Sequence, residues 1–304
     1  MKHTKIWLAC WLLFSLSQPT QILAWNKPTH MVIGAMVYQE MKKSSPKALA
    51  RMIALLQKHP QYQQWVDQMN QYHIPLADRD ERLLMEAARW PDDTRGSQYD
   101  HPSWHYINFL YQPSLAMPQD SILPTGEHIL QAYKTNLDLW KSTAPDSSRA
   151  VALCWIMHLV GDVHQPLHTT SFVNAEFPLG DRGGNMIYIK AKEDSKTINL
   201  HSLWDGLLLA SNRPQEAANT AIQLRNEVSR QSLSNLSIKN VEQWAKESFS
   251  LAKKVAYLAG RIQASTDREN GTPLPASYTT TAKSIAEKQV ALAAYRLADL
   301  LAAK

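Results

Sequence analysis

Cysteine is scarce in this chain of 304 residues, which contains only Cys10 and Cys154. Cys10 lies in an apolar N-terminal stretch that we expect to be removed, and Cys154 would then remain alone. No intramolecular disulfide could form, so the class of disulfide-rich exported folds is excluded. The remaining chain of about 280 residues is long enough to bury one sizeable core, which bound ligands or metal ions could reinforce.

Linkers, low-complexity tracts and internal repeats are also missing from the sequence. We therefore expect one domain over residues 25–304. Apolar residues recur with helical spacing along most of it, which predicts an all-α fold. The predicted helices are residues 30–41, 48–57, 79–90, 127–140, 148–163, 215–230, 241–258 and 281–303.

Two segments interrupt the helical pattern. Residues 99–118 are rich in aromatic residues and contain proline, which predicts a loop. Residues 171–199 contain the sequence Gly-Asp-Arg-Gly-Gly-Asn followed by alternating polar and apolar residues at 186–190. This second pattern predicts a short β-hairpin. Long irregular segments in a compact domain are usually functional.

A basic stripe of the kind that binds nucleic acid by charge alone is absent. The formal net charge is +5, and it falls to +3 if Lys2 and Lys5 leave with the N-terminal stretch (5 − 2 = 3). This mild excess is compatible with a polyanionic substrate. Affinity for phosphate must then be concentrated in a site.

The apolar run of residues 6–16 is too short to cross a bilayer with ease. Basic residues precede it, and the small residue Ala24 lies where a signal peptidase would cleave. We therefore expect residues 1–24 to be a signal peptide, with Trp25 as the mature N-terminus of a secreted or periplasmic protein. An uncleaved anchor is the weaker alternative, because the run is short and the residues after it are polar.

The strongest motif is His-Leu-Val-Gly-Asp-Val-His-Gln-Pro-Leu-His, from His158 to His168. His158 and Asp162 are four residues apart, so on a helix both side chains face the same way. Pro166 stops the helix, and His168 lies beyond its end. A buried carboxylate among apolar residues is costly unless it is paired or metal-bound. The alternative is a solvated His/Asp pair, which the apolar flanks disfavour.

A second His/Asp pair with the same spacing lies at His201 and Asp205. His105, within Trp-His-Tyr, and Asp92, within Trp-Pro-Asp, add two further candidate ligands. This set offers nitrogen and oxygen but essentially no thiolate. Such ligands are typical of hydrolytic zinc, which keeps open positions for water, rather than of a closed cysteine site.

Taken in order, these motifs resemble the zinc-dependent nucleases of the S1/P1 type. The resemblance covers the chain from Trp25 through Asp205, and residues 291–301 resemble the last helix of that family. The matching motifs are Trp-x-x-x-x-His at 25–30, Trp-x-Asp-x-x-Arg at 90–95, Trp-His-Tyr at 104–106, His-x-x-x-Asp-x-x-x-x-x-His at 158–168 and Asn-Leu-His-x-x-Trp-Asp at 199–205.

The resemblance implies three zinc ions and a helical fold shared with phospholipase C. The ligands it assigns are Asp92, His105, His158 and Asp162 for one ion, His168, His201 and Asp205 for a second, and His30, Asp162 and the free amino group and carbonyl of Trp25 for a third. Only removal of the signal peptide would release that amino group.

The resemblance also implies hydrolysis of single-stranded DNA and RNA to 5′-phosphorylated products, with 3′-nucleotidase activity. Asp92, Asp162 and Arg95 would be catalytic, with Arg95 contacting the phosphate. Tyr106 would stack on a base and Asn108 would hydrogen-bond its edge. From the sequence alone, Arg95 could instead be a surface arginine, and Tyr106 could be a core residue.

Several histidines lie outside this scheme. We expect His59, His73, His101 and His128 to be surface residues, and His164 to be buried support. Two other functions remain open: a zinc phospholipase C, which has Glu where this chain has Asp205, and a non-catalytic zinc-binding protein. The expected partners are single-stranded DNA, RNA and nucleotides, with no stable membrane association, and we expect a monomer.

Overall fold

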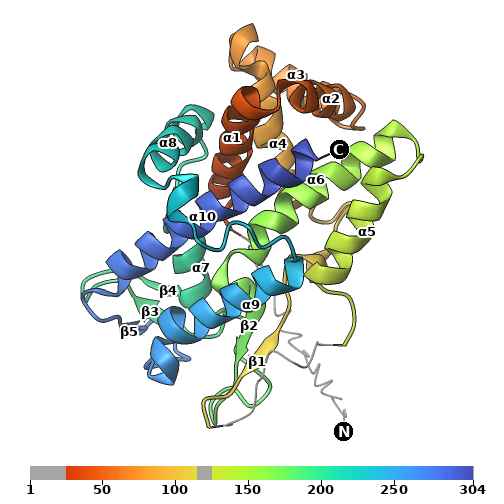
Figure 1. Ribbon diagram of the computed structural model, residues 1–304. Coiled ribbons are helices and arrows are strands. Elements are labelled where there is room, and N and C mark those ends of the chain that lie inside the picture. The colour runs from red at the N-terminus through yellow and green to blue at the C-terminus, as the bar shows by residue number, and fades with distance from the viewer. Residues whose placement is uncertain (1–24, 115–124, 304) are drawn as a thin grey trace, which may run out of the picture.

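The structure is a computed structural model that describes residues 25–114 and 125–303. The expected signal peptide, residues 115–118 of the predicted loop and Lys304 lie outside these ranges. Helices dominate the described residues and strands are few and short, which confirms the mainly helical fold (Figure 1).

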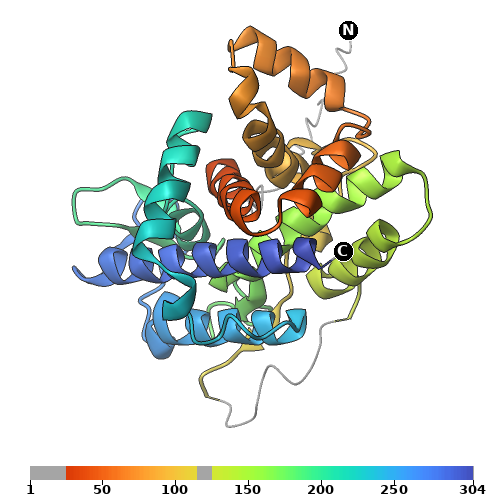
Figure 2. The ribbon, with the colours of Figure 1, turned by 45° about the horizontal axis from the view of Figure 1, so that its top comes forward.

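Helix α1 (Lys27–Ser44) lies at the centre of the helical body. It packs against α4 (Arg79–Asp93), α8 (Pro214–Glu227) and α10 (Tyr278–Ala302), and Figure 2 shows α1 nearly end-on between them. The helix begins where the Asn26 side chain accepts a hydrogen bond from the Thr29 backbone N–H, which caps the first turn. Its first turns are buried almost all round, as in a core helix.

Helix α6 (Asp146–Val163) is the second central helix. It packs against α4 and α5 (Ile129–Lys141), and every residue of it from 152 to 163 is buried. A helix that is apolar on all sides has to be covered on all sides. The two polar side chains that its last turns carry, His158 and Asp162, are therefore buried inside the protein.

The other helices complete the shell. They are α2 (Pro46–Leu56), α3 (Tyr62–Gln71), α7 (Leu200–Asp205) and α9 (Val241–Leu251), together with short 3₁₀ turns at Leu76–Asp78, Pro102–His105, Pro166–Thr169, Arg230–Ser232 and Leu258–Gly260. A π-helical turn, Ala252–Ala256, follows α9 directly.

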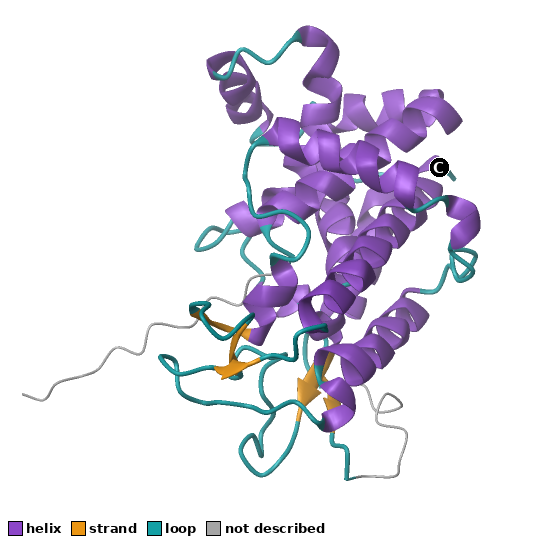
Figure 3. Ribbon diagram, turned by 90° about the vertical axis from the view of Figure 1, so that its left-hand side faces the viewer, coloured by secondary structure: helices purple, strands orange, loops and turns teal. Residues whose placement is uncertain are grey.

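The strands gather at one end of the helical body, as Figure 3 shows in orange. β1 (Phe109–Tyr111) pairs in parallel with β2 (Thr170–Phe172), with Phe109 opposite Thr170. β3 (Tyr188–Lys190) and β4 (Thr197–Asn199) form the antiparallel hairpin expected from the sequence, and β5 (Thr272–Pro273) adds to β3 in parallel.

The structure corrects several sequence predictions, and the short helix α7 was not among the predicted helices. Residues 99–118 were expected to be loop only, but they contain a 3₁₀ turn and β1, because a distant segment, β2, supplies the pairing partner. The helix predicted for 241–258 ends as an α-helix at Leu251. Helix α3 was not predicted, because its sequence is mostly polar and only Trp65 and Met69 of its residues are buried.

Candidate metal centre

Eight of the predicted ligand residues come together in three groups, and all eight are buried. Within each group, one nitrogen or oxygen atom from each residue lies within 4.8 Å of the others. The groups are His30, His158 and Asp162; Asp92, His105 and His158; and His168, His201 and Asp205. We call the first two together the Asp162 cluster and the third the Asp205 cluster.

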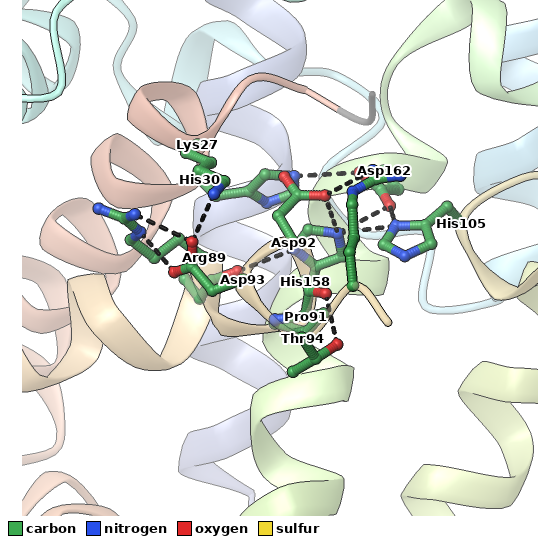
Figure 4. Close-up of polar contacts among 12 residues, drawn as sticks. Lys27, His30, Arg89, Pro91, Asp92, Asp93, Thr94, His105, His158 and Asp162 are labelled. Atoms are coloured by element: carbon green, nitrogen blue, oxygen red, sulfur yellow. Dashed lines mark hydrogen bonds and ion pairs between the residues drawn. The ribbon is translucent and has the colours of Figure 1, made fainter. Parts of the chain in front are cut away.

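Asp162 lies at the meeting point of three histidines (Figure 4). Its Oδ2 is 3.1 Å from His158 Nε2, one turn earlier on α6, and 3.1 Å from His105 Nδ1, which the 3₁₀ turn at 102–105 supplies. Its Oδ1 is 3.1 Å from Nε2 of His30 on α1. Asp92, near the end of α4, brings Oδ1 to 4.0 Å from His158 Nε2.

The Asp205 cluster adjoins the Asp162 cluster. Nε2 of His168 is 3.2 Å from Nε2 of His201, which in turn is 3.5 Å from Asp205 Oδ2. Tetrahedral zinc with ligands at about 2.0–2.2 Å separates those ligands by roughly 3.3–3.6 Å, so these spacings are close to what an ion requires. His168 Nδ1 lies 4.0 Å from Asp162 Oδ2, which makes the two clusters neighbours.

The outer nitrogens of three histidines contact backbone carbonyls. Nδ1 of His158 donates to Ala88 O at 3.0 Å, Nδ1 of His168 to His105 O at 2.6 Å, and Nδ1 of His201 to Gly183 O at 2.7 Å. A proton on Nδ1 leaves Nε2 as the atom with a free lone pair. Histidines that bind metal ions are commonly oriented by such a hydrogen bond on the other nitrogen.

Charges in the centre are strongly perturbed. Burial raises the pKa of Asp162, but the charges of His158 and His168 outweigh it and hold that pKa well below its usual range. Burial raises the pKa of Asp205 well above its usual range, and repulsion from Asp162 and Asp92 adds to the effect. Burial, with repulsion from His158, lowers the pKa of His30 to about 4. A neutral His30 beside closely packed carboxylates favours a bound cation.

Several buried polar atoms of the centre make no hydrogen bond of acceptable geometry with the described residues, although His30 Nε2 and Asp162 Oδ1 lie 3.1 Å apart. These atoms are both ring nitrogens of His30, Oδ2 of Asp92, Oδ1 of Asp162 and Oδ2 of Asp205. Leaving such atoms unpaired costs free energy, so native structures rarely do it without a reason. Imidazole nitrogens and carboxylate oxygens with no thiolate are donors that suit zinc, and the residues present therefore fit such ions.

Trp25 is fully buried beside the same centre. Its indole Nε1 donates to Gly161 O at 3.0 Å, one residue before Asp162. Gly161 also lacks a side chain where one would collide with His30, since a Cβ there would lie 2.9 Å from the imidazole. The first residues after the expected cleavage point are thus anchored next to the Asp162 cluster.

Arg95, Tyr106 and Asn108 also lie at the centre. Arg95 Nη2 is 3.4 Å from Asp92 Oδ1. Tyr106 and Asn108 line a cavity of about 350 Å³ together with the ligand candidate His201. Tyr106 and Asn108 lie one and three residues after His105 in the chain. Between them, the Ile107 N–H donates to His168 O at 2.8 Å, which joins residues 106–108 to the Asp205 cluster.

Sequence reasoning overlooked Gln165, which lies inside the strongest motif. Its Nε2 donates to Asp205 Oδ1 at 2.8 Å, while its Oε1 accepts from the Leu167 N–H. The side chain therefore orients one carboxylate of the centre. Its position between two candidate ligands in the sequence was the available signal.

The expectation for two other histidines was wrong. His59 and His128 are buried rather than on the surface, whereas His73 is exposed and His101 is half-buried. His59 stacks on Trp65, with ring centroids 4.5 Å apart, which sequence spacing does not reveal.

His164 is fully buried, as expected, but it belongs to a separate network. Its Nδ1 donates to Val160 O at 2.7 Å, and its Nε2 accepts a hydrogen bond from Arg296 at 2.9 Å. Burial and the charge of Arg296 lower the pKa of His164 to about 3, so the ring is neutral and ties α6 to α10.

Comparisons with known proteins agree with this arrangement. A family model described as S1/P1 Nuclease matches residues 25–304. Nuclease S1 of Aspergillus oryzae is 31% identical over 152 residues, which cover 47% of this chain and 46% of that protein. Endonuclease 2 of Arabidopsis thaliana is 23% identical over 211 residues, covering 66% of this chain and 61% of the relative. Endonuclease 5 of the same plant is 30% identical over 245 residues, covering 72% and 76%. The match thus spans less than two thirds of the length of the first two relatives.

Proposed function

The chain belongs to the S1/P1 nuclease family, and from that premise we propose that it is a zinc-dependent endonuclease. It cleaves phosphodiester bonds of single-stranded DNA and RNA, releases 5′-phosphorylated products and has 3′-nucleotidase activity. The observation that supports this most strongly is the meeting of three His/Asp groups in one buried centre.

We assign one ion to Asp92, His105, His158 and Asp162, and a second to the Asp205 cluster. His30, Asp162 and the amino group and carbonyl of Trp25 hold a third. The two ring nitrogens of His30 and Asp162 Oδ1 make no hydrogen bond of acceptable geometry, which supports this third position. The two groups of the Asp162 cluster have His158 in common, whereas the two ions that we assign there have Asp162 as their common ligand. Asp162 has two oxygens facing different histidines and can serve both ions.

Bound zinc supplies positive charge and Lewis acidity and activates water for attack on phosphorus. The chain itself orients the reaction. Asp162, fixed on α6, keeps the ligand groups of two ions together, and Asp92 holds the α4 side of the cluster. Arg95 lies beside Asp92 with its guanidinium partly exposed, where its forked donors bind phosphate oxygens.

The preference for single strands follows from the cavity beside the centre. Tyr106 offers an aromatic ring and Asn108 an amide on the cavity wall. A base can stack on that ring only after it has left its own stack, and its edge then becomes available to the amide. Paired bases in a duplex cannot do this without being extruded.

We also propose that the protein is exported and that removal of residues 1–24 completes the third metal position. The anchoring of Trp25 beside Asp162 supports this, because a free amine can bind a metal ion whereas an amide nitrogen is a poor ligand. No helix in the parts of the chain that the structure describes is long and apolar enough to cross a membrane.

The deciding experiment is a parallel assay of the zinc-loaded protein on denatured DNA, RNA, duplex DNA and phosphatidylcholine. We expect hydrolysis of the single-stranded nucleic acids, and loss of at least about a hundredfold in kcat for the His158→Ala and Asp162→Asn variants. His73→Ala, at an exposed histidine outside the centre, is the matched control. Cleavage of the lipid alone would identify a phospholipase, and full zinc loading without turnover of any phosphate ester would identify a binding protein.

A further inference from the structure

The cavity beside the centre contains a residue to which neither the motifs nor the proposed reaction assigns a role. Five of the described residues line it: Tyr106, Asn108, Leu167, Arg182 and His201. A volume of about 350 Å³ lies within the range of small-ligand pockets, roughly 300–1,000 Å³. Among these described residues, Arg182 contributes the only formally charged side chain if the imidazole is neutral.

Arg182 is held in an unusual backbone conformation. Its φ is +57°, in the left-handed region that residues other than glycine adopt at a cost. The Asn185 side chain supports the turn by donating to Arg182 O at 2.8 Å. Residues in such backbone conformations cluster at functional sites and persist where the surrounding structure holds them in place.

The turn that carries Arg182 is fixed on both sides. Asp181 is buried and accepts hydrogen bonds from the Phe172 N–H at 2.7 Å, the Gly184 N–H at 2.8 Å and the Tyr257 hydroxyl at 2.8 Å. On the other side, Gly183 O accepts the hydrogen bond from His201. A Cβ on Gly183 would lie 2.4 Å from Leu167 O, so the turn packs closely against Leu167, which also lines the cavity.

Arg182 forms no ion pair with the residues that the structure describes. The described residues that line the cavity include no carboxylate, and the neighbouring Asp181 side chain accepts hydrogen bonds from Phe172, Gly184 and Tyr257 instead. The side chain is exposed, and so it can swing onto a ligand without breaking an existing pair. An arginine on the wall of a cavity without acids suits an anion, and its forked donors suit phosphate best.

We propose that Arg182 binds a phosphate of the nucleic acid strand whose base occupies the cavity with Tyr106 and Asn108. The inference rests on the proposed nuclease function and adds a residue to it. Arg182 contributes affinity for the strand rather than acceleration of bond cleavage, because it contacts a phosphate flanking the one that is cleaved. Removing it raises KM and leaves kcat nearly unchanged.

The test measures binding directly, using zinc-loaded protein and a fluorescein-labelled phosphorothioate oligodeoxythymidylate, which resists hydrolysis. Fluorescence anisotropy gives Kd across a series of salt concentrations. The variants are Arg182→Gly, Arg182→Lys and, as matched control, Lys43→Ala. Lys43 is exposed near the far end of α1, thirteen residues or roughly 20 Å from His30.

Arg182→Gly separates binding from structure. Glycine adopts positive φ freely, so the variant should melt at the same temperature as the wild type or higher. It should nonetheless bind the oligonucleotide roughly tenfold more weakly. The slope of log K against log salt should fall in magnitude by about 0.7, the loss of one phosphate contact to a single strand. Arg182→Lys should keep the slope, and Lys43→Ala should leave both Kd and slope unchanged.

Two results overturn the inference while leaving the nuclease function in place. One is an unchanged Kd and slope for Arg182→Gly, and the other is an equal loss for Lys43→Ala, which would indicate only general charge. If the wild-type protein neither binds nor cleaves single strands, the proposed function itself fails, and the two failures are thereby distinguished.

Discussion

At the scale of single residues, the centre depends on which nitrogen of each histidine faces inward. Backbone carbonyls fix this for His158, His168 and His201 by accepting a hydrogen bond from Nδ1. The sequence cannot specify those carbonyls, because they come from Ala88, His105 and Gly183, far away in the chain. They become visible only in the folded structure.

Protonation of His59 predicts a pH dependence of stability. Burial lowers its pKa from 6.5 to about 4, so the unfolded chain binds the proton first as pH falls. The contribution of neutral His59 to stability is therefore complete above about pH 6.5 and is lost progressively down to pH 4, by at most about 3 kcal/mol. Chemical denaturation of the wild type and of His59→Phe, between pH 8 and pH 4, should show a shallower decline for the variant. Parallel declines would contradict the assignment.

Residue spacing predicted which candidate ligand side chains come together, and it predicted the environment of other histidines poorly. His158 and Asp162 need only one helical turn to converge, which four-residue spacing guarantees. The burial of His59 depends instead on Trp65 and Trp90, which lie on two different helices. Such an environment is a property of tertiary packing and leaves no periodic signal.

At the scale of elements, the site rests on the close approach of α1, α4 and α6. Gly34 allows α1 to lie against the backbone of α4, because a Cβ there would be 2.5 Å from Leu84 O. This contact sets the position of α1, which carries His30, relative to α4, which carries Asp92. From these helices His30 faces Asp162 and Asp92 faces His158, both on α6.

Gly34→Ala should therefore destabilise the protein, although alanine normally favours a helix. Overpacking against backbone typically costs about 1–3 kcal/mol, and the melting temperature should fall by several degrees. Gly206→Ala is the matched control, since its Cβ would meet nothing closer than 3.4 Å and its φ is negative. Calorimetry should separate the two variants, and equal melting temperatures would mean that α1 and α4 can move apart freely.

Helices with strong apolar patterns were predictable element by element, and the strand pairing was only partly so. The β3–β4 hairpin joins neighbouring segments, and its alternating pattern indicated it. The β1–β2 pair joins Phe109 to Thr170, sixty-one positions apart (170 − 109 = 61), through three-residue strands. Strands this short have too few residues to show a period, and so the pairing that places Tyr106 and Asn108 beside His168 was not predictable.

At the scale of the whole molecule, the described residues are held together by core burial without a disulfide, and the proposed metal ions would add to that stability. The two central helices carry or contact most of the ligand candidates, and the only cysteine that the structure describes, Cys154, is buried and free. Binding of ions to the folded state alone stabilises that state by mass action. The fold and the site are therefore coupled energetically.

This coupling predicts how the whole protein responds to chelators and reductants. Excess chelator should lower the melting temperature by several degrees, because each ion bound at a hundredfold excess over its Kd contributes about 2.7 kcal/mol. Added zinc should restore it, whereas dithiol reductant at concentrations too low to bind zinc should change nothing. A melting temperature insensitive to chelation would separate the fold from the metal centre.

The most direct test of the account is anomalous diffraction at the zinc absorption edge from crystals of the zinc-loaded protein beginning at Trp25. We expect three peaks: one among Asp92, His105, His158 and Asp162, one among His168, His201 and Asp205, and one between His30, Asp162 and the Trp25 amine. Each should lie about 2.0–2.2 Å from its ligand atoms. Zinc bound elsewhere, or no peak among these residues, would contradict the account.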